Sequence, residues 1–234
     1  MCGRFALTSA PETIRRTFGY EEQPNFPPRY NIAPTQPIAI VTGAQDSEGR
    51  FRRRFQLVRW GFLPGFVKDA QNFPLLINAR AETAAEKASF RNALRRRRCL
   101  VPADAYYEWL RFRIDGKTAR RAFLFRRADG EAMGLAGLWE PYLSPDGSEI
   151  DTACILTTEA NGATVAVHDR MPVIIERKDF ARWLDCDGVD VREAATLMKP
   201  IDNDALTFFE IGPAINKATA SGLELQAPLQ RPLA

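Results

Sequence analysis

Residues 105–158 read AYYEWLRFRIDGKTARRAFLFRRADGEAMGLAGLWEPYLSPDGSEIDTACILTT, and the pattern in this stretch decides the fold. Asp-Gly pairs at 115–116, 129–130 and 146–147 separate runs rich in Phe, Leu, Ile and Trp. An Asp-Gly pair between apolar runs is the strongest short-range signal for a β-hairpin, because both residues tolerate the positive φ that a tight hairpin turn needs. The stretch therefore predicts antiparallel sheet through the middle of the chain.

The flanking segments add a strand and four short helices. Residues 52–60 (RRRFQLVRW) alternate imperfectly as a strand and run into a Gly-Phe-Leu-Pro-Gly turn. We expect helices at Pro11–Phe18, behind the candidate cap Ser9, and at 82–97, 178–184 and 191–198, and a structured proline-rich loop at 20–37. Because strands and helices do not alternate, the pattern predicts an α+β fold: a curved antiparallel sheet or open β-barrel-like core flanked by short helices.

The composition indicates a globular protein in a reducing compartment. With 234 residues, 45% of them hydrophobic, the chain can bury a full core, and without repeats or a linker we expect one domain over residues 1–234. The four cysteines lie far apart and His168 is the only histidine, which argues against a zinc site. No run approaches the ~20 apolar residues of a membrane span. We expect a cytoplasmic protein with free thiols, no metal and no cofactor.

Arginine is bunched, although the net charge is only +3. Residues 50–59 hold five arginines, and residues 91–98 hold five more. Such clusters favour a polyanionic partner such as nucleic acid. The alternative is a solvated surface, with Arg95–Arg98 at the C-terminus of a helix and Arg52 and Arg54 on the outer face of a strand. Charge alone leaves both interpretations open.

The chain begins Met-Cys-Gly-Arg, and removal of Met1 would leave two nucleophiles on one residue. Cys2 would then carry a free α-amine and a thiol, with pKa values of about 8 and ~8.5. The amine can form an imine with an aldehyde, and the thiol can close that imine to a five-membered thiazolidine. Arg4 adds a fixed cation, which suits a carbonyl next to a phosphate. The alternative is a buried, structural Cys2 behind a retained Met1.

Four further segments combine polar side chains with turn-forming residues. They read RYNIAPT at 29–35, NARAET at 78–83, PADAYYEW at 102–109 and VHDRMP at 167–172. Together with the Met-Cys-Gly-Arg start, and in this order, they resemble the SRAP family, named for SOS-response-associated peptidase. The resemblance extends from Cys2 to about Pro228. Five motifs in order are a far more specific signal than any one of them.

The resemblance implies a set of catalytic residues and a set of DNA contacts. Cys2 would form the covalent link to DNA, Asn78 would orient its amine or the captured sugar, and Glu108 would be the general acid or base. His168 would stabilise the phosphate 3′ to the lesion and assist proton transfer. The DNA contacts implied by the resemblance are Arg4, Asn31, Pro34, Trp60, Phe62, Arg80, Thr157, Thr158 and Arg170.

Local chemistry bears on two of these roles. Glu108 lies between two aromatic residues, and an apolar setting raises the pKa of a carboxyl group toward neutrality. Trp60, Phe62 and Pro64 offer a face on which a base flanking the lesion can stack. The alternatives are an outward-facing strand carboxylate for Glu108, and core or turn packing for the two aromatic residues.

The function that the resemblance implies is capture of abasic sites in single-stranded DNA. After removal of Met1, by self-processing or by an aminopeptidase, Cys2 would form a thiazolidine crosslink that shields the strand during replication, with weak lyase activity at the imine stage. We expect a monomer associated with the nucleoid, with abasic single-stranded DNA and replication-fork proteins as partners. Two alternatives stay open: an N-terminal cysteine glutamine amidotransferase, and a non-covalent single-strand binding module.

Overall fold

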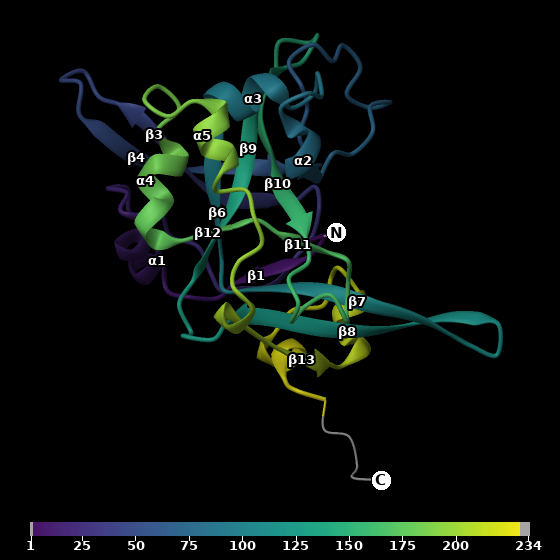
Figure 1. Cartoon of the computed structure of the whole chain (residues 1–234). Coiled ribbons are helices and arrows are strands. Elements are labelled where there is room, and N and C mark those ends of the chain that lie inside the picture. The colour runs from purple at the N-terminus through teal and green to yellow at the C-terminus, as the bar shows by residue number, and fades with distance from the viewer. Residues whose placement is uncertain (1, 230–234) are drawn as a thin grey trace.

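Two β-sheets make up most of the computed structural model, which describes residues 2–229 (Figure 1). The strands of the first sheet are β1 (Phe5–Leu7), β2 (Arg29–Ile32), β7 (Ala105–Ile114), β8 (Lys117–Arg127) and β13 (Leu206–Ile211). Those of the second are β3 (Pro37–Gln45), β4 (Phe51–Trp60), β5 (Asn78–Arg80), β6 (Arg98–Ala103), β9 (Met133–Leu143), β10 (Glu149–Glu159), β11 (Arg170–Pro172) and β12 (Ile174–Ile175). The main hydrophobic core contains residues of both sheets.

The α+β class predicted from the sequence is confirmed, with two departures in strand pairing. Asp115-Gly116 and Asp146-Gly147 close the β7–β8 and β9–β10 hairpins, but Asp129-Gly130 joins β8 of the first sheet to β9 of the second. Both edges of β8 are already occupied, by β7 and β13, so the chain cannot fold back on it there. The second sheet is also not wholly antiparallel, because β10 pairs in parallel with β4 and with β5.

Short helices and turns surround the sheets, as predicted, but their bounds differ. They are α1 (Pro11–Phe18), α2 (Ala81–Ala84), α3 (Arg91–Arg96), α4 (Phe180–Leu184), α5 (Val191–Ala195), and the 3-10 turns η1 (Arg177–Asp179), η2 (Asn203–Ala205), η3 (Pro213–Asn216) and η4 (Leu223–Gln226). The single helix expected over 82–97 is wrong, since α2 and α3 are separate. The N-cap of α1 is Ala10, and the Ser9 hydroxyl donates instead to Asp104 (2.7 Å). No helix within residues 2–229 has the length and apolar content to cross a membrane.

One arginine of the 91–98 cluster has a structural role inside the fold. Arg98, expected at an exposed helix end, is buried and donates to the backbone carbonyls of Trp183 (2.6 Å), Asp185 (2.6 Å), Val189 (2.9 Å) and Leu94 (3.1 Å). A buried charge is tolerated only when it is hydrogen-bonded in this way. Arg98 therefore ties the segment after α4 to β6 and does not contribute to the surface charge.

The fold places β1, the first strand of the chain, where the two sheets approach each other (Figure 1). β1 pairs with β7, and the Tyr107 amide donates to the Arg4 carbonyl (3.0 Å), so residues 2–4 run beside Glu108. On the second sheet, β10 pairs with β5 and with β11, which aligns Thr157 with Arg80 and Glu159 with Arg170. Segments far apart in the sequence therefore lie side by side: residues 2–4 with Glu108, and residues 78–80 and 170–172 with the end of β10.

Candidate active site around Cys2

Cys2 is fully buried, and the residues after it line a cavity of about 240 Å³. The lining residues are Gly3, Arg4, Glu108, Trp109, Arg111, Arg120, His168 and Asn216. Burial raises the pKa of the Cys2 thiol well above its ordinary value, and the charge of Glu108 raises it further. The Cys2 sulfur is therefore a neutral thiol near pH 7 and needs a base to take its proton.

Glu108 is suited to that proton transfer. The residue is 3% exposed, and burial is the largest cause that raises the pKa of its carboxyl group to about 7, with the negative charge of Asp169 acting in the same direction. Both protonation states are therefore populated at neutral pH, so the group can give a proton at one step and accept one at another. The sequence alternative of an outward-facing strand carboxylate is wrong, whereas the expected raised pKa is confirmed.

His168 lies next to Glu108 with a defined proton position. Its Nδ1 accepts the backbone N–H of Arg170 (3.0 Å), so in the neutral ring the proton sits on Nε2, which lies 3.8 Å from Glu108 Oε2. Asp169 Oδ1 is 3.0 Å from Nδ1 and can form an ion pair only when the ring is protonated. Burial lowers the pKa of His168, and the charge of Arg111 lowers it further, so the neutral ring is favoured.

The raised Glu108 pKa makes stability depend on pH. Because the folded-state pKa of about 7 exceeds the ordinary 4.5, the stabilising contribution is complete below about pH 4.5 and is lost as the pH rises to 7. At 1.36 kcal/mol per pH unit, wild type should lose about 3 kcal/mol of unfolding free energy relative to Glu108→Gln over this range. Urea unfolding of both proteins at several pH values measures this. Parallel pH curves for the two proteins would contradict it.

Asn78 and Arg80 lie on β5, beside the end of β10. The Asn78 amide donates to the Ile155 carbonyl (3.3 Å), while its buried Oδ1 has no hydrogen-bond partner in the described part of the chain. That oxygen can therefore accept a hydrogen bond from a bound ligand. Arg80 is exposed, and no acidic side chain within residues 2–229 pairs with it, which leaves its guanidinium available to a phosphate.

Arg170 and the two threonines are more enclosed than the sequence suggested. The Arg170 guanidinium forms a forked ion pair with Glu82 (2.7 and 2.9 Å) and also donates to the Thr157 carbonyl (2.6 Å). Thr157 and Thr158 are both buried, and the Thr157 hydroxyl faces the Ala79 carbonyl at 3.5 Å. The two threonines therefore lie in the protein interior, next to the Arg170 guanidinium, and not on the protein surface.

Arg4 is held by Asn31, a residue that the sequence placed among direct DNA contacts. Arg4 Nη1 donates to Asn31 Oδ1 (2.6 Å) and to the Ile215 carbonyl (3.0 Å), and the guanidinium lies 5.9 Å from the centre of the Trp109 ring. The Asn31 amide donates to the Lys217 (2.9 Å) and Ala220 (2.8 Å) carbonyls. Asn31 is 7% exposed, so its position favours orienting Arg4, and Pro34 follows in a partly exposed turn.

The expected base-stacking face of Trp60 and Phe62 is wrong. Both side chains are 0% exposed: the Trp60 indole donates to the Ile77 carbonyl (3.0 Å) and its ring meets Phe5 edge-on at 5.2 Å. Phe62 packs at 5.6 Å against Phe90. Strand alternation could not reveal this, because the neighbouring elements cover both rings. The exposed aromatic residue of this segment is Phe66, at 60%.

Sequence reasoning missed four lining residues of the cavity: Trp109, Arg111, Arg120 and Asn216. Trp109 donates its indole proton to Asn216 Oδ1 (2.7 Å), which fixes one wall, and a neighbouring cavity of about 500 Å³ shares Trp109, Arg111 and His168 with the first. Trp109 lay within the motif at 102–109, and Asn216 lay within the overall extent of the family resemblance but in none of the five motifs. Arg111 and Arg120 carried no signal other than charge.

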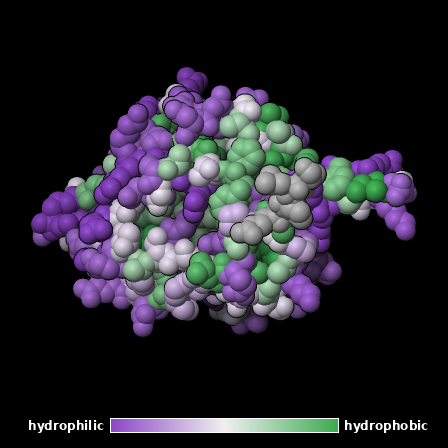
Figure 2. All heavy atoms as spheres, turned by 90° about the horizontal axis from the view of Figure 1, so that it is seen from below, coloured by the Kyte–Doolittle hydropathy of each residue, from purple (hydrophilic) through white to green (hydrophobic). Residues whose placement is uncertain are grey.

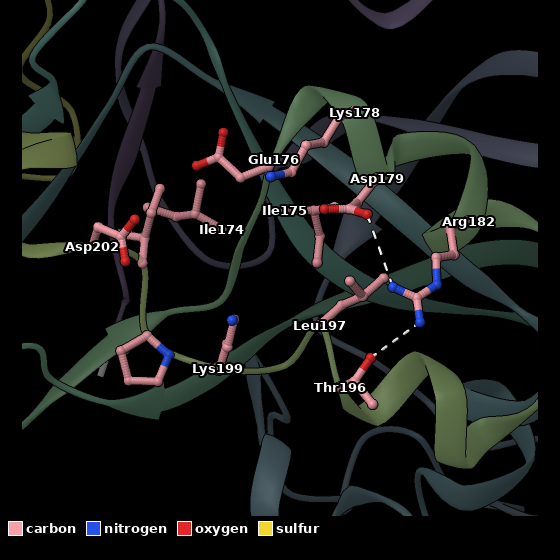
Figure 3. A pocket seen from close by; sticks show the side chains of 12 residues that line it. Ile174, Ile175, Glu176, Lys178, Asp179, Arg182, Thr196, Leu197, Lys199 and Asp202 are labelled. Carbon is pink, nitrogen blue, oxygen red and sulfur yellow. Dashed lines mark hydrogen bonds and ion pairs between the residues drawn. The ribbon is translucent and has the colours of Figure 1, made fainter.

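A larger cavity lies elsewhere, between α4 and residues 196–202, and contains none of the predicted site residues (Figure 3). It measures about 640 Å³, and Arg182 at its edge is held by Asp179 (4.0 Å) and Thr196 (3.4 Å). Neither a cysteine nor a histidine lines it. Within residues 2–229, no group of three or more His, Cys, Asp or Glu side chains is placed to hold a metal ion.

Comparison with known proteins shows the family of this chain. A family model described as SOS response associated peptidase (SRAP) matches residues 1–218. The chain belongs to the SRAP family. A relative named abasic site processing protein YoqW, from Bacillus subtilis (strain 168), is 34% identical over 228 residues, which cover 96% of this chain and 98% of the relative. Abasic site processing protein HMCES from Rattus norvegicus is 26% identical over 97% of this chain and 76% of its own length.

Solved structures confirm that the SRAP chain has a known fold. A protein from Bacteroides thetaiotaomicron superimposes with a TM-score of 0.83 at 23% identity, covering 97% of this chain and 100% of the other. A protein from Bordetella bronchiseptica gives a TM-score of 0.74 at 27% identity over 90% of this chain and all of the other. The α+β arrangement that surrounds Cys2 is therefore shared with experimentally determined structures.

Proposed function

We propose that this SRAP-family protein captures the ring-opened aldehyde of an abasic site in single-stranded DNA and holds it as a thiazolidine on Cys2. The observation that carries the proposal is the position of Cys2 beside Glu108, a buried carboxyl group whose pKa is about 7. Its relatives are named abasic site processing proteins, which supports abasic DNA as the substrate.

The first stage joins the amine to the sugar. Removal of Met1, which lies outside the described residues, would convert the Cys2 nitrogen into a free amine. The amine adds to the aldehyde carbon to give a carbinolamine, and protonated Glu108 donates a proton to the departing hydroxyl, so that one water leaves and an imine forms. Asn78, with its unpartnered buried Oδ1, would orient the amine or the sugar.

The second stage closes the ring. Loss of water leaves the imine protonated and Glu108 as a carboxylate. The Cys2 sulfur then adds to the imine carbon, the nitrogen keeps its proton as a neutral ring N–H, and Glu108 accepts the thiol proton, so the crosslink as a whole releases one water. The neutral His168 ring, whose Nε2–H faces Glu108, would relay or stabilise that proton. An open imine also permits β-elimination, which explains the expected weak lyase activity, and closure removes the imine and so protects the strand.

The arginines around Cys2 suit the phosphates on either side of the captured sugar. Arg4 lines the cavity itself, and Arg80 is exposed with no acidic partner in the described chain. Arg170 is engaged by Glu82, so a phosphate that binds its fork must displace this carboxylate. Forked guanidinium–phosphate contacts are short and directional, which fits positioning of the strand over Cys2.

A denaturing gel tests the proposed function directly. A single-stranded oligonucleotide with one abasic site should give a band of lower mobility that survives denaturation, and an intact strand should give none. An amidotransferase would instead release ammonia from glutamine, and a simple binding module would bind both strands reversibly. Either of those results without the shifted band would refute covalent capture.

A further inference from the structure

The β7–β8 hairpin extends far beyond the sheet that anchors it (Figure 1). β7 and β8 pair continuously to Ile114↔Lys117, but β1 reaches β7 only at Ala105 and Tyr106, and β13 pairs with β8 only from Ala122 onward. Residues 110–121 therefore form a two-stranded ribbon with both edges unpaired, and Figure 2 shows it standing clear of the body. Such ribbons are only marginally stable by themselves.

One face of this ribbon carries three cations. Arg111 and Arg120 are directly opposite each other, so their side chains share a face, and Arg113 follows two residues along the same face. Like charges placed directly opposite destabilise a strand pair. No acidic side chain within residues 2–229 forms an ion pair with any of the three. The face of Arg111, Arg113 and Arg120 is called the basic ribbon face below.

On the opposite face of the ribbon, one arginine is neutralised by a carboxylate. Arg121 lies opposite Leu110 on that face and forms an ion pair with Glu210, with its Nε donating at 2.7 Å. The remaining neighbours there include Phe112 and Ile114, and Ile114 is 55% exposed. Arg121 is therefore neutralised by a carboxylate, whereas Arg111, Arg113 and Arg120 on the basic ribbon face have no acidic partner within residues 2–229; Lys117, opposite Ile114, is a further cation near the ribbon tip.

The basic ribbon face begins at the candidate active site. Arg111 and Arg120 line the same cavity as Glu108 and His168. Burial is the first cause that lowers the pKa of both His168 and Arg4, but Arg111 also lowers that of His168 and Arg120 that of Arg4, so the ribbon charges act on the site. A ligand that neutralises the ribbon would thus lie next to Cys2.

We infer that the basic ribbon face binds successive phosphates of the strand that leads away from the captured sugar. Alternate residues of a strand lie about 6.8 Å apart, roughly one nucleotide step of an extended single strand, so Arg111 and Arg113 can follow the backbone. Guanidinium forks bind phosphate oxygens without reading bases. The identity of the strand as abasic DNA rests on the proposed function, whereas binding of its phosphates does not.

A binding experiment tests the inference without any crosslink. It compares how wild type and Arg111→Ala/Arg120→Ala bind an intact single-stranded oligonucleotide. Fluorescence anisotropy over a range of salt concentrations should show weaker binding and a slope of log K against log salt that is flatter by about 1.4, since each phosphate that an arginine no longer neutralises removes about 0.7. The matched control is Arg16→Ala/Arg192→Ala, which removes two exposed charges from α1 and α5 that form no ion pair within residues 2–229, and it should leave the slope unchanged.

The possible outcomes separate this inference from the proposed function. Equal slopes for the two double variants would overturn the role of the ribbon. The melting temperature of Arg111→Ala/Arg120→Ala should stay equal or rise, because a repulsive pair is removed; a fall would indicate a structural role and also count against the inference. If wild type forms no crosslink while the slope still depends on Arg111 and Arg120, covalent capture fails and the ribbon site stands.

Discussion

Cys2→Ala is expected to abolish the denaturation-resistant complex with abasic single-stranded DNA completely, while non-covalent binding persists. The alanine variant keeps an N-terminal amine after Met1 removal but has no thiol, so an imine can form and hydrolyse without being trapped in a ring. The arginines that would hold the strand, among them Arg4 and Arg80, are untouched. A denaturing gel measures the complex, and an intact mass shows whether Met1 is absent.

The serine variant separates the two nucleophiles of Cys2. Cys2→Ser retains the amine and should give a complex only when a reductant such as borohydride converts the imine to a stable amine. Cys186→Ser is the matched control, because it removes a half-buried thiol that does not line the cavity beside Cys2, and it should crosslink like wild type. A complex of normal yield from Cys2→Ala without reductant would show that another group attacks the sugar.

Glu108→Gln is expected to slow crosslinking at neutral pH by roughly 10²- to 10⁴-fold, the usual contribution of a positioned general acid or base. Glutamine has nearly the same shape as glutamate but carries no proton to donate and accepts none from the thiol. The rate of appearance of the crosslinked band under single-turnover conditions measures the effect. Glu12→Gln, an exposed substitution on α1, should leave the rate unchanged.

The dependence of the crosslinking rate on pH tests whether the Glu108 carboxyl group is the proton donor. In wild type the rate should rise as the amine loses its proton, with a pKa of about 8, and fall as Glu108, with a pKa of about 7, loses the proton that it donates. The profile is then bell-shaped, and Glu108→Gln should lack its falling limb. A variant that is slower at all pH values with the bell preserved would place Glu108 in a structural role only.

Local signals predicted some elements well and others poorly, for reasons visible in single residues. Asp115-Gly116 closes a hairpin because the turn is decided by its own two φ values, 49° and 76°. Asp129-Gly130 gives the same signal, yet the next strand crosses to the other sheet because β13 occupies the free edge of β8. The pattern over 82–97 similarly could not show that the helix breaks between α2 and α3.

The candidate site shows the same division. The sequence motifs were enough to name Cys2, Asn78, Glu108 and His168 as candidates. Each motif is a short run of consecutive residues that can be recognised without knowing the fold. Whether Trp60 faced DNA or the core could not be read that way, because burial depends on which elements pack over a strand. Arg170 likewise looked free in sequence, although Glu82, 88 residues away in the chain, occupies its fork.

The sequence by itself determined the family and the α+β class and supplied the proposed reactive residues, because these depend on residue order, local turn chemistry and hydrophobic pattern. Tertiary structure alone decided which of them act together: the pairing of β1 with β7 sets Cys2 beside Glu108, and burial in that position shifts the carboxyl pKa to about 7. It also decided which arginines remain unneutralised, Arg111 and Arg120 among them. Desolvation and charge compensation are properties of neighbours in space, and those neighbours exist only once the two sheets have formed.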